Sequence, residues 1–316
     1  MKPGKRFYWL CGALALVSLL GWWVHFGDPV DYSGSEFQSK PSDPYYRRAV
    51  KLPGVAAETA ITPALLAGRA GSAEVRQVLT PEGEWQPYER LNTLHDLPDD
   101  LSADDCRLLM AYLSAGPNDN FEYALKNDIM NVLRNQAHLP PELTGTLLAL
   151  YRDKAENIVV RVYALQHLRP QYEKTKDPAI REAFYEALDE SDTEIAGGAL
   201  LALRYLATEY PTEFDRERVT SKALELAEQP ETFLLTRISA VQVASSLEAP
   251  GLGVRLQELV KNETTPLMLR IASIAGLGEL GETAALPDLE ELSRKDSPAA
   301  QAALAAVRKL KGKSLQ

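Results

Sequence analysis

The chain has 316 residues, enough for one large domain or two small ones, and its 45% apolar and 25% charged residues are typical of a globular protein. With 34 Lys and Arg against 44 Asp and Glu, its formal net charge is −10. This acidity argues against nucleic-acid binding, which needs clustered basic side chains. Two cysteines are too few for a fold held together by disulfides.

The N-terminal segment predicts a membrane anchor. Residues 1–6 carry only basic charges, and Phe7–Phe26 then runs for 20 residues without Asp, Glu, Lys or Arg. A helix of this length spans about 30 Å, the thickness of a bilayer core. The basic end should stay in the cytoplasm, so we expect a single-pass protein of the inner membrane with the bulk of the chain in the periplasm.

Two other interpretations of this segment stay open. A cleaved signal peptide usually has a shorter apolar stretch and a small-x-small cleavage site, whereas here bulky residues such as Trp22 and Trp23 close the stretch. Lipidation would use Cys11, but Tyr8, Trp9 and Leu10 before it are large for such a site.

The next segments predict a tether followed by a short lead-in. Residues 27–60 are rich in Pro, Ser, Gly and Asp and have no sustained periodicity, which is typical of a linker outside the membrane. Residues 61–84 form a loosely helical lead-in, with short helices expected near Pro63–Ala67 and Ala73–Leu79.

From residue 85 to 316 the pattern predicts an all-α array. Apolar residues recur at helical spacing between breaks of Pro, Gly, Asp and Asn, and no stretch alternates as a strand would. One helix position, which we call the anchor, is followed seven residues later by an apolar residue and recurs every 30 to 41 residues. The anchors are Arg90, Lys126, Arg161, Ala196, Arg237, Arg270 and Ala300.

A second helix is expected between most anchors, so that each unit is a helix pair that buries its apolar face on its neighbours. The expected second helices are Leu101–Leu113, Pro141–Tyr151, Pro178–Leu188, Arg216–Ala227, Val254–Val260 and Leu286–Leu292. Small residues at 196–199 and 275–278 suggest places where helices approach closely.

Several helix openings resemble those of HEAT repeats. Residues 266–292 resemble the short HEAT-like repeats first seen in bilin-lyase proteins, and Asn157–Arg161 and Asp177–Arg181 match the family's Asp/Asn-x-x-Val/Ile-Arg opening. Near Asp192 the arginine is replaced by Ala196. The resemblance covers about 85–310 and implies an α-solenoid, a right-handed superhelix whose second helices line a concave, protein-binding face.

No catalytic or cofactor motif is found, so we expect no enzyme activity, no cofactor and no metal. His95 and His167 fall at similar distances after their anchors, which suggests a repeated packing position rather than a metal site. The acidic residues around Ser102 are expected to cap a helix, and Cys106 is expected to be a buried thiol. Asn262 begins a glycosylation sequon that matches by chance in many chains.

The remaining functional candidate is the face made by the second helices. Its expected exposed members are Tyr151, Arg152, Arg181, Tyr185, Arg218, Lys222, Arg255 and Glu258. Tyr and Arg are common anchors of protein interfaces. We therefore expect a scaffold or accessory subunit that binds a protein of the membrane or envelope. A periplasmic chaperone or peptide- or ligand-binding module is the first alternative, and a lyase or hydrolase related to repeat-containing lyases is the second.

Overall fold

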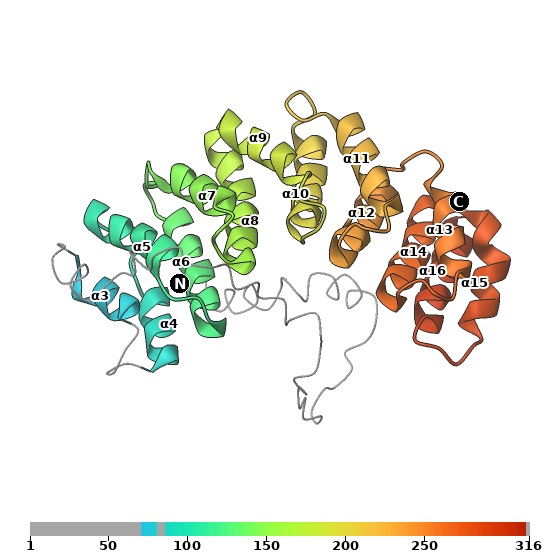
Figure 1. Cartoon of the computed structure of the whole chain (residues 1–316), viewed down its shortest axis with the longest axis horizontal. Helices are drawn as coiled ribbons and strands as arrows, with labels where there is room; N and C mark the ends of the chain where they lie inside the picture. Colours follow the sequence, from blue (N-terminus) through green and yellow to red (C-terminus); the bar gives the residue numbers. More distant parts are fainter. Residues whose placement is uncertain (1–70, 81–85, 314–316) are drawn as a thin grey trace, which may run out of the picture. The chain divides into compact units, whose positions relative to one another are not determined.

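The computed structural model describes residues 71–80 and 86–313, and this part of the chain is entirely helical, with no strand (Figure 1). The predicted span Phe7–Phe26, the linker 27–60 and residues 61–70 and 81–84 of the lead-in lie outside the described residues. Among the described helices, none combines the length and hydropathy needed to cross a membrane. The chain divides into two compact units: unit 1 ends at Val132, and unit 2 begins at Leu133.

Unit 1 contains the first helices of the described chain: α3 (Ala73–Leu79), α4 (Pro87–His95), α5 (Ala103–Ala115) and the larger part of α6 (Asn120–Arg134). Helix α3 packs against both α4 and α5. The expected bounds of α3 are confirmed. The core of unit 1 includes aliphatic side chains from all four helices, with Val78, Leu94, Leu113 and Ile129 fully buried.

Unit 2 continues with helices separated by short turns. They are α7 (Leu143–Arg152), α8 (Ile158–Thr175), α9 (Pro178–Ala187), α10 (Ile195–Glu209), α11 (Arg216–Glu228), α12 (Leu234–Ser246), α13 (Leu252–Lys261), α14 (Leu267–Leu280), the 3-10 helix η3 (Thr283–Ala285), α15 (Leu286–Ser293) and α16 (Ala300–Lys313). The expected second helices match α5, α7, α9, α11, α13 and α15 to within two residues at each end.

The helix openings follow from local hydrogen bonding. Asn157 and Asp177 are the N-caps of α8 and α9, where a side-chain oxygen accepts from the backbone N–H of Val159 at 2.9 Å and of Ala179 at 2.8 Å. Pro178 follows Asp177 at the first helical position, where no N–H is needed. The Asp/Asn openings seen in the sequence therefore begin helices.

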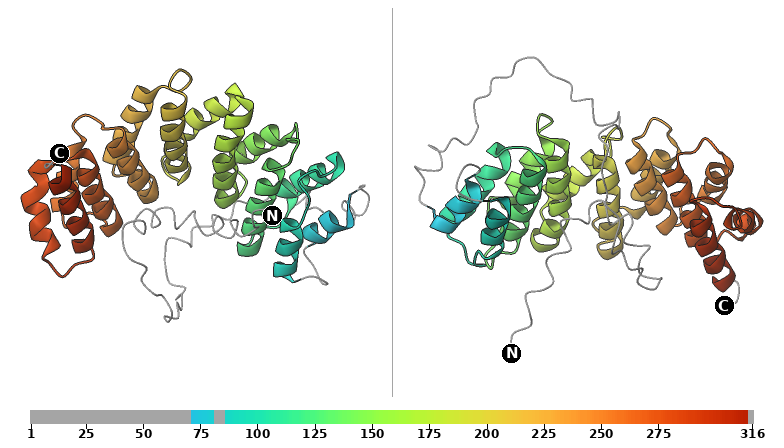
Figure 2. Two further views of the ribbon diagram at one scale, coloured as in Figure 1. Left: turned by 180° about the vertical axis from the view of Figure 1, so that it is seen from behind. Right: turned by 90° about the horizontal axis from the view of Figure 1, so that it is seen from below.

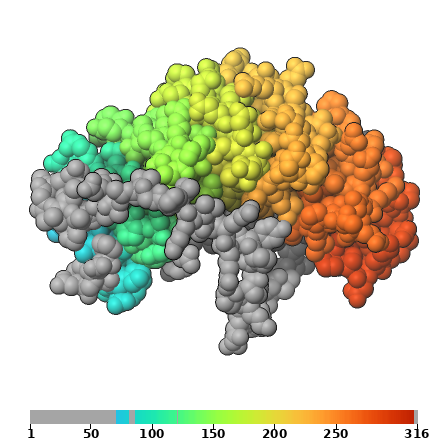
Figure 3. Space-filling view, in the orientation of Figure 1, coloured from blue at the N-terminus to red at the C-terminus, as the bar shows by residue number. Residues whose placement is uncertain are grey.

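The even-numbered helices of unit 2 form a continuous packed row. Helices α8, α10, α12, α14 and α16 contact one another in that order, and each odd-numbered helix packs on an even-numbered one. Direct contacts between odd-numbered helices are sparser. The further views and the space-filling view show the helices of unit 2 succeeding one another in chain order from green to red (Figures 2 and 3).

Close approach at the glycines of the row is confirmed at two contacts. A Cβ added at Gly197 of α10 would lie 3.1 Å from the Cα of Thr236 in α12. One added at Gly278 of α14 would lie 3.3 Å from the Cα of Ala306 in α16. Glycine is thus retained inside these helices, despite its low helix propensity, because a neighbouring backbone occupies the space.

Candidate functional site

Four of the anchor side chains donate hydrogen bonds to the end of the preceding helix. The Nε–H groups of Arg90 and Arg161 donate to the carbonyls of Val78 and Tyr151, each at 2.8 Å. Arg237 donates from Nε and Nη2 to the carbonyl of Ala227, both at 3.3 Å, and the ammonium of Lys126 donates to the carbonyl of Gly116 at 3.0 Å. A cation here satisfies carbonyls that have no partner in their own helix and opposes the negative end of its dipole.

Helical spacing identifies these anchor positions in the sequence but does not reveal their hydrogen bonds. In each case the accepting carbonyl belongs to a residue 10 or 12 positions earlier, at the end of the preceding helix. A basic residue that follows a predicted helix end at this interval is the signal that could have revealed the contact.

All eight candidate residues of the expected face lie on the odd-numbered helices. Tyr151 and Arg152 are on α7, and Arg181 and Tyr185 are on α9. Arg218 and Lys222 are on α11, and Arg255 and Glu258 are on α13. The structure therefore places them on the expected helices, but in three different kinds of environment.

The expectation that the two tyrosines are exposed is wrong. Tyr151 is only 2% exposed and contacts the guanidinium of Arg161, 5.8 Å from its ring centroid. Tyr185 is 9% exposed, stacks on Phe214, and its hydroxyl accepts a hydrogen bond from the N–H of Asp215 at 3.1 Å. Helical spacing could not reveal this burial, because the side chains that cover both rings come from other parts of the chain.

Three of the charged candidates connect neighbouring odd-numbered helices. Arg152 of α7 pairs with Glu186 of α9 at 3.0 Å. Arg255 of α13 pairs with Glu228 of α11 at 3.2 Å. Similarly, the guanidinium of Arg218 on α11 lies 4.0 Å from the ring centroid of Tyr185 on α9. Much of the expected face is thus occupied with contacts inside the array.

The other charged candidates pair within their own helices. Arg181 contacts Glu182 at 3.4 Å, and Lys222 contacts Glu225 at 2.8 Å. Glu258 contacts Arg255 at 3.4 Å. These side chains are partly or fully exposed, and such surface pairs contribute little to stability.

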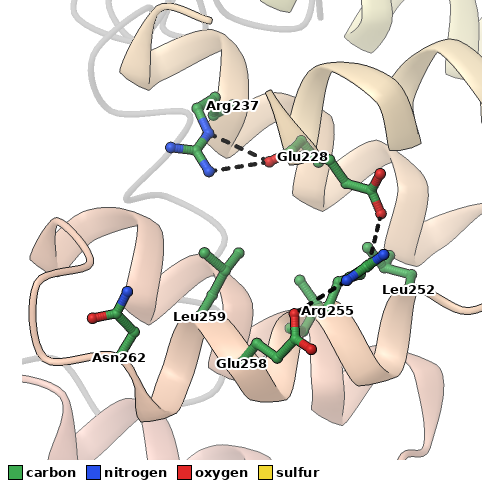
Figure 4. A pocket seen from close by; sticks show the side chains of 9 residues that line it. Glu228, Arg237, Leu252, Arg255, Glu258, Leu259 and Asn262 are labelled. Atoms are coloured by element: carbon green, nitrogen blue, oxygen red, sulfur yellow. Dashed lines mark hydrogen bonds and ion pairs between the residues drawn. The ribbon is translucent and has the colours of Figure 1, made fainter. Parts of the chain in front are cut away.

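A half-open groove of about 430 Å³ lies between the end of α11, the start of α12 and helix α13 (Figure 4). This volume lies within the range of small ligand sites. The groove contains two of the candidates, Arg255 and Glu258. Its lining is made by Ala227, Glu228, Arg237, Leu252, Arg255, Leu256, Glu258, Leu259 and Asn262.

The two ends of the groove differ in charge balance. At one end Arg255 lies between Glu228 and Glu258 and forms an ion pair with each of them. At the other, Arg237 lies across from Leu259 and Asn262 (Figure 4). Burial lowers the pKa of the Arg237 guanidinium, and the nearby Glu231 partly opposes this shift.

The most exposed large apolar side chains of unit 2 all fall in one segment of the chain, on or next to helices α12, α13 and α14. Five of the six such residues in the described part of the chain fall between residues 233 and 268. They are Phe233, Leu234, Val254, Leu267 and Met268, with exposed fractions of 37% to 62%. Phe233 and Leu234 lie one helical turn before Arg237, and Leu267 occupies in α14 the place that Leu234 has in α12. Together we call these five residues the apolar rim.

The two histidines do not share a packing position, so that expectation is wrong. His95 is partly exposed and contacts Asp128 through Nε2 at 2.9 Å. His167 is buried in α8, and burial, together with the charge of Arg134, lowers its pKa to about 3. The two rings follow their anchors at similar distances, but they lie in different units with different surroundings.

Two other expectations for unit 1 are confirmed. Ser102 caps α5, accepting from the N–H of Asp105 at 3.1 Å, and Asp105 also accepts from the N–H of Ser72 at 2.7 Å. Cys106 is buried, with 6% of its surface exposed. Within the described residues, no three His, Cys, Asp or Glu side chains are grouped to hold a metal ion.

Comparison of the chain with models of known protein families and with the sequences of curated proteins finds no match.

Proposed function

We propose that the chain is a non-enzymatic protein-binding scaffold, built as an α-solenoid of HEAT-like helix pairs and anchored in the inner membrane by Phe7–Phe26. The observation that carries the proposal is the apolar rim, which is formed by exposed apolar residues at the starts of α12 and α14 and on α13. Exposed apolar clusters beside polar side chains are typical of protein interaction sites. A membrane anchor would concentrate this surface near partners in the same membrane.

The repeat supports the solenoid part of the proposal. Arg90, Arg161, Arg237 and Arg270 are each the fourth residue of their helix, in α4, α8, α12 and α14. The serial contacts of the even-numbered helices are those expected when each helix pair buries its apolar face on the next. HEAT-like repeats provide such surfaces mostly for protein partners, as the sequence resemblance implies.

The test is recovery of a partner from intact membranes. The full chain is cross-linked in cells, solubilised and isolated, and its partners are compared with those of the double variant Leu267→Glu, Met268→Glu. We expect a reproducible partner whose yield falls about tenfold in the variant, because charges placed in an apolar interface must be desolvated. Tyr88→Glu, at an exposed large apolar residue of unit 1, is the control. Absence of any reproducible partner, or equal recovery by all three proteins, would contradict the scaffold.

A peptide-binding or chaperone module is the second candidate, favoured by the size and half-open form of the groove. Such a module would bind many extended segments rather than one folded partner. Suppression of the aggregation of an unrelated unfolded protein, lost in the same double variant, would favour it over a dedicated scaffold.

A further inference from the structure

In two of the anchor arginines, Arg90 and Arg161, the guanidinium meets both a helix-end carbonyl and a carboxylate. Arg90 donates to Glu122 at 2.6 Å and to the hydroxyl of Tyr112 at 2.9 Å. Arg161 donates to both carboxylate oxygens of Glu190, at 2.9 and 2.7 Å. In each pair the arginine side chain is almost completely buried, with 3% and 6% exposed. The carboxylate therefore neutralises a charge that would be costly to bury alone.

Arg237 has the same carbonyl contact but no carboxylate. Its two hydrogen bonds both go to the carbonyl of Ala227, and no carboxylate in the described part of the chain forms an ion pair with it. The turn after α13 supplies the amide Asn262 to the groove. The acidic lining residues Glu228 and Glu258 are paired with Arg255 at the other end (Figure 4).

Open space lies beside the guanidinium of Arg237. Arg237 faces the groove of about 430 Å³, and the apolar side chains of Leu252, Leu256 and Leu259 line the same groove. Phe233 and Leu234 are exposed one turn before Arg237 on α12. A ligand that suits this site has a carboxylate for the guanidinium and apolar groups on either side of it.

We infer that the groove binds an Asp or Glu side chain of a partner polypeptide, whose carboxylate pairs with Arg237 while flanking apolar side chains contact the leucines that line the groove, Leu259 among them. The inference rests on the proposed scaffold function and specifies the chemistry of its partner. Arginine suits this role because its planar donors can hold both oxygens of one carboxylate. The groove is partly shielded from water, which strengthens the pair.

The first experiment compares two peptides on the wild-type full chain in detergent. The probes are fluorescein-labelled Ala-Leu-Glu-Leu-Ala and the same peptide with Gln in place of Glu, and binding is followed by fluorescence anisotropy. We expect the Glu peptide to bind about tenfold more tightly, the difference between a charged and a neutral hydrogen-bonding partner. Equal affinities for the two peptides, or no binding of either, would overturn the inference without the use of any variant.

The second experiment assigns the preference to one residue. Arg237→Gln should bind both peptides equally, whereas Arg255→Gln, which alters the other end of the groove, should keep the preference for Glu. A preference that survives in Arg237→Gln overturns the inference. Circular dichroism verifies that the variants are folded. Arg237→Lys keeps the positive charge but lacks the planar guanidinium, so its preference for the Glu peptide should lie between those of the wild type and Arg237→Gln.

The two proposals fail in different ways. A membrane partner that is recovered equally well by wild type and Arg237→Gln supports the scaffold and rejects the carboxylate site. Glu-selective peptide binding with no recoverable membrane partner supports the site and rejects the scaffold.

Discussion

In unit 2, the contacts between successive even-numbered helices differ in kind from the contacts between successive odd-numbered helices. Along the row α8–α16, contacts are made mainly by buried apolar and small residues, with backbones as close as Gly197 and Thr236, and an exposed pair of Lys309 with Glu279 is added between α14 and α16. Along the odd-numbered helices, neighbours are joined by exposed ion pairs, such as Arg152 with Glu186 and Lys261 with Asp288 at 2.9 Å. Burial of apolar surface stabilises strongly, whereas exposed ion pairs contribute at most about 1 kcal/mol. The row should therefore carry most of the stability of unit 2.

The largest effect is expected from filling the closest contact of the row. Gly197→Val should lower the free energy of unfolding by about 3 kcal/mol, because the new side chain meets the backbone of Thr236 and the helices must separate. In the control Gly198→Val, a Cβ meets only Leu165, at 3.9 Å, so the loss should be much smaller. Urea unfolding followed by circular dichroism measures both. Equal losses would show that the row tolerates wider spacing.

The second prediction compares two arginines at equivalent places. Arg161→Met leaves the carboxylate of Glu190, which is 15% exposed, with only the exposed ammonium of Lys154 as an ion-pair partner and should cost about 2 kcal/mol. Arg237→Met strands no carboxylate in the described part of the chain and should cost less than about 1 kcal/mol. Thermal unfolding of both variants tests the difference, and an equal or larger loss for Arg237→Met would contradict it.

Acid should lower the free energy of unfolding of unit 2 through protonation of His167. The folded-state pKa of about 3 lies below the usual value of 6.5, so the neutral ring is favoured in the fold and its contribution is lost as pH falls below 6.5. Between pH 6 and pH 5 this amounts to about 1 kcal/mol. In His167→Gln, the stability should be lower at pH 7 but should fall less steeply over this interval. Unfolding curves at several pH values measure the slope, and identical slopes would exclude His167 as the cause.

The smallest effect is expected on the other side of the comparison. Arg152→Ala removes an exposed ion pair and should cost about 0.5 kcal/mol or less, an amount that disappears at 1 M salt. Thermal unfolding at low and high salt tests this. A loss above about 2 kcal/mol would mean that the odd-numbered helices carry more of the stability than their contacts indicate.

Much of the helix pattern could be predicted from the sequence because its signals are local. Caps such as Asp177 and breaks between apolar stretches depend on nearby residues, and α3 and α9 accordingly begin where expected. The candidate site was predicted less well. The burial of Tyr185 and the open position of Arg237 depend on which distant side chains come near, and that information is not contained in the periodicity of one helix.

The ion pairs between odd-numbered helices have a mechanical consequence. Apolar packing joins the even-numbered helices, whereas salt-sensitive ion pairs join the odd-numbered helices. The even-numbered row is therefore the stiffer of the two, and unit 2 should flex mainly by changing the distances between its odd-numbered helices. The Glu228–Arg255 link spans α11 and α13, the helices that border the groove. A change in the spacing of α11 and α13 at that link changes the width of the groove, while the packing of the even-numbered helices stays intact.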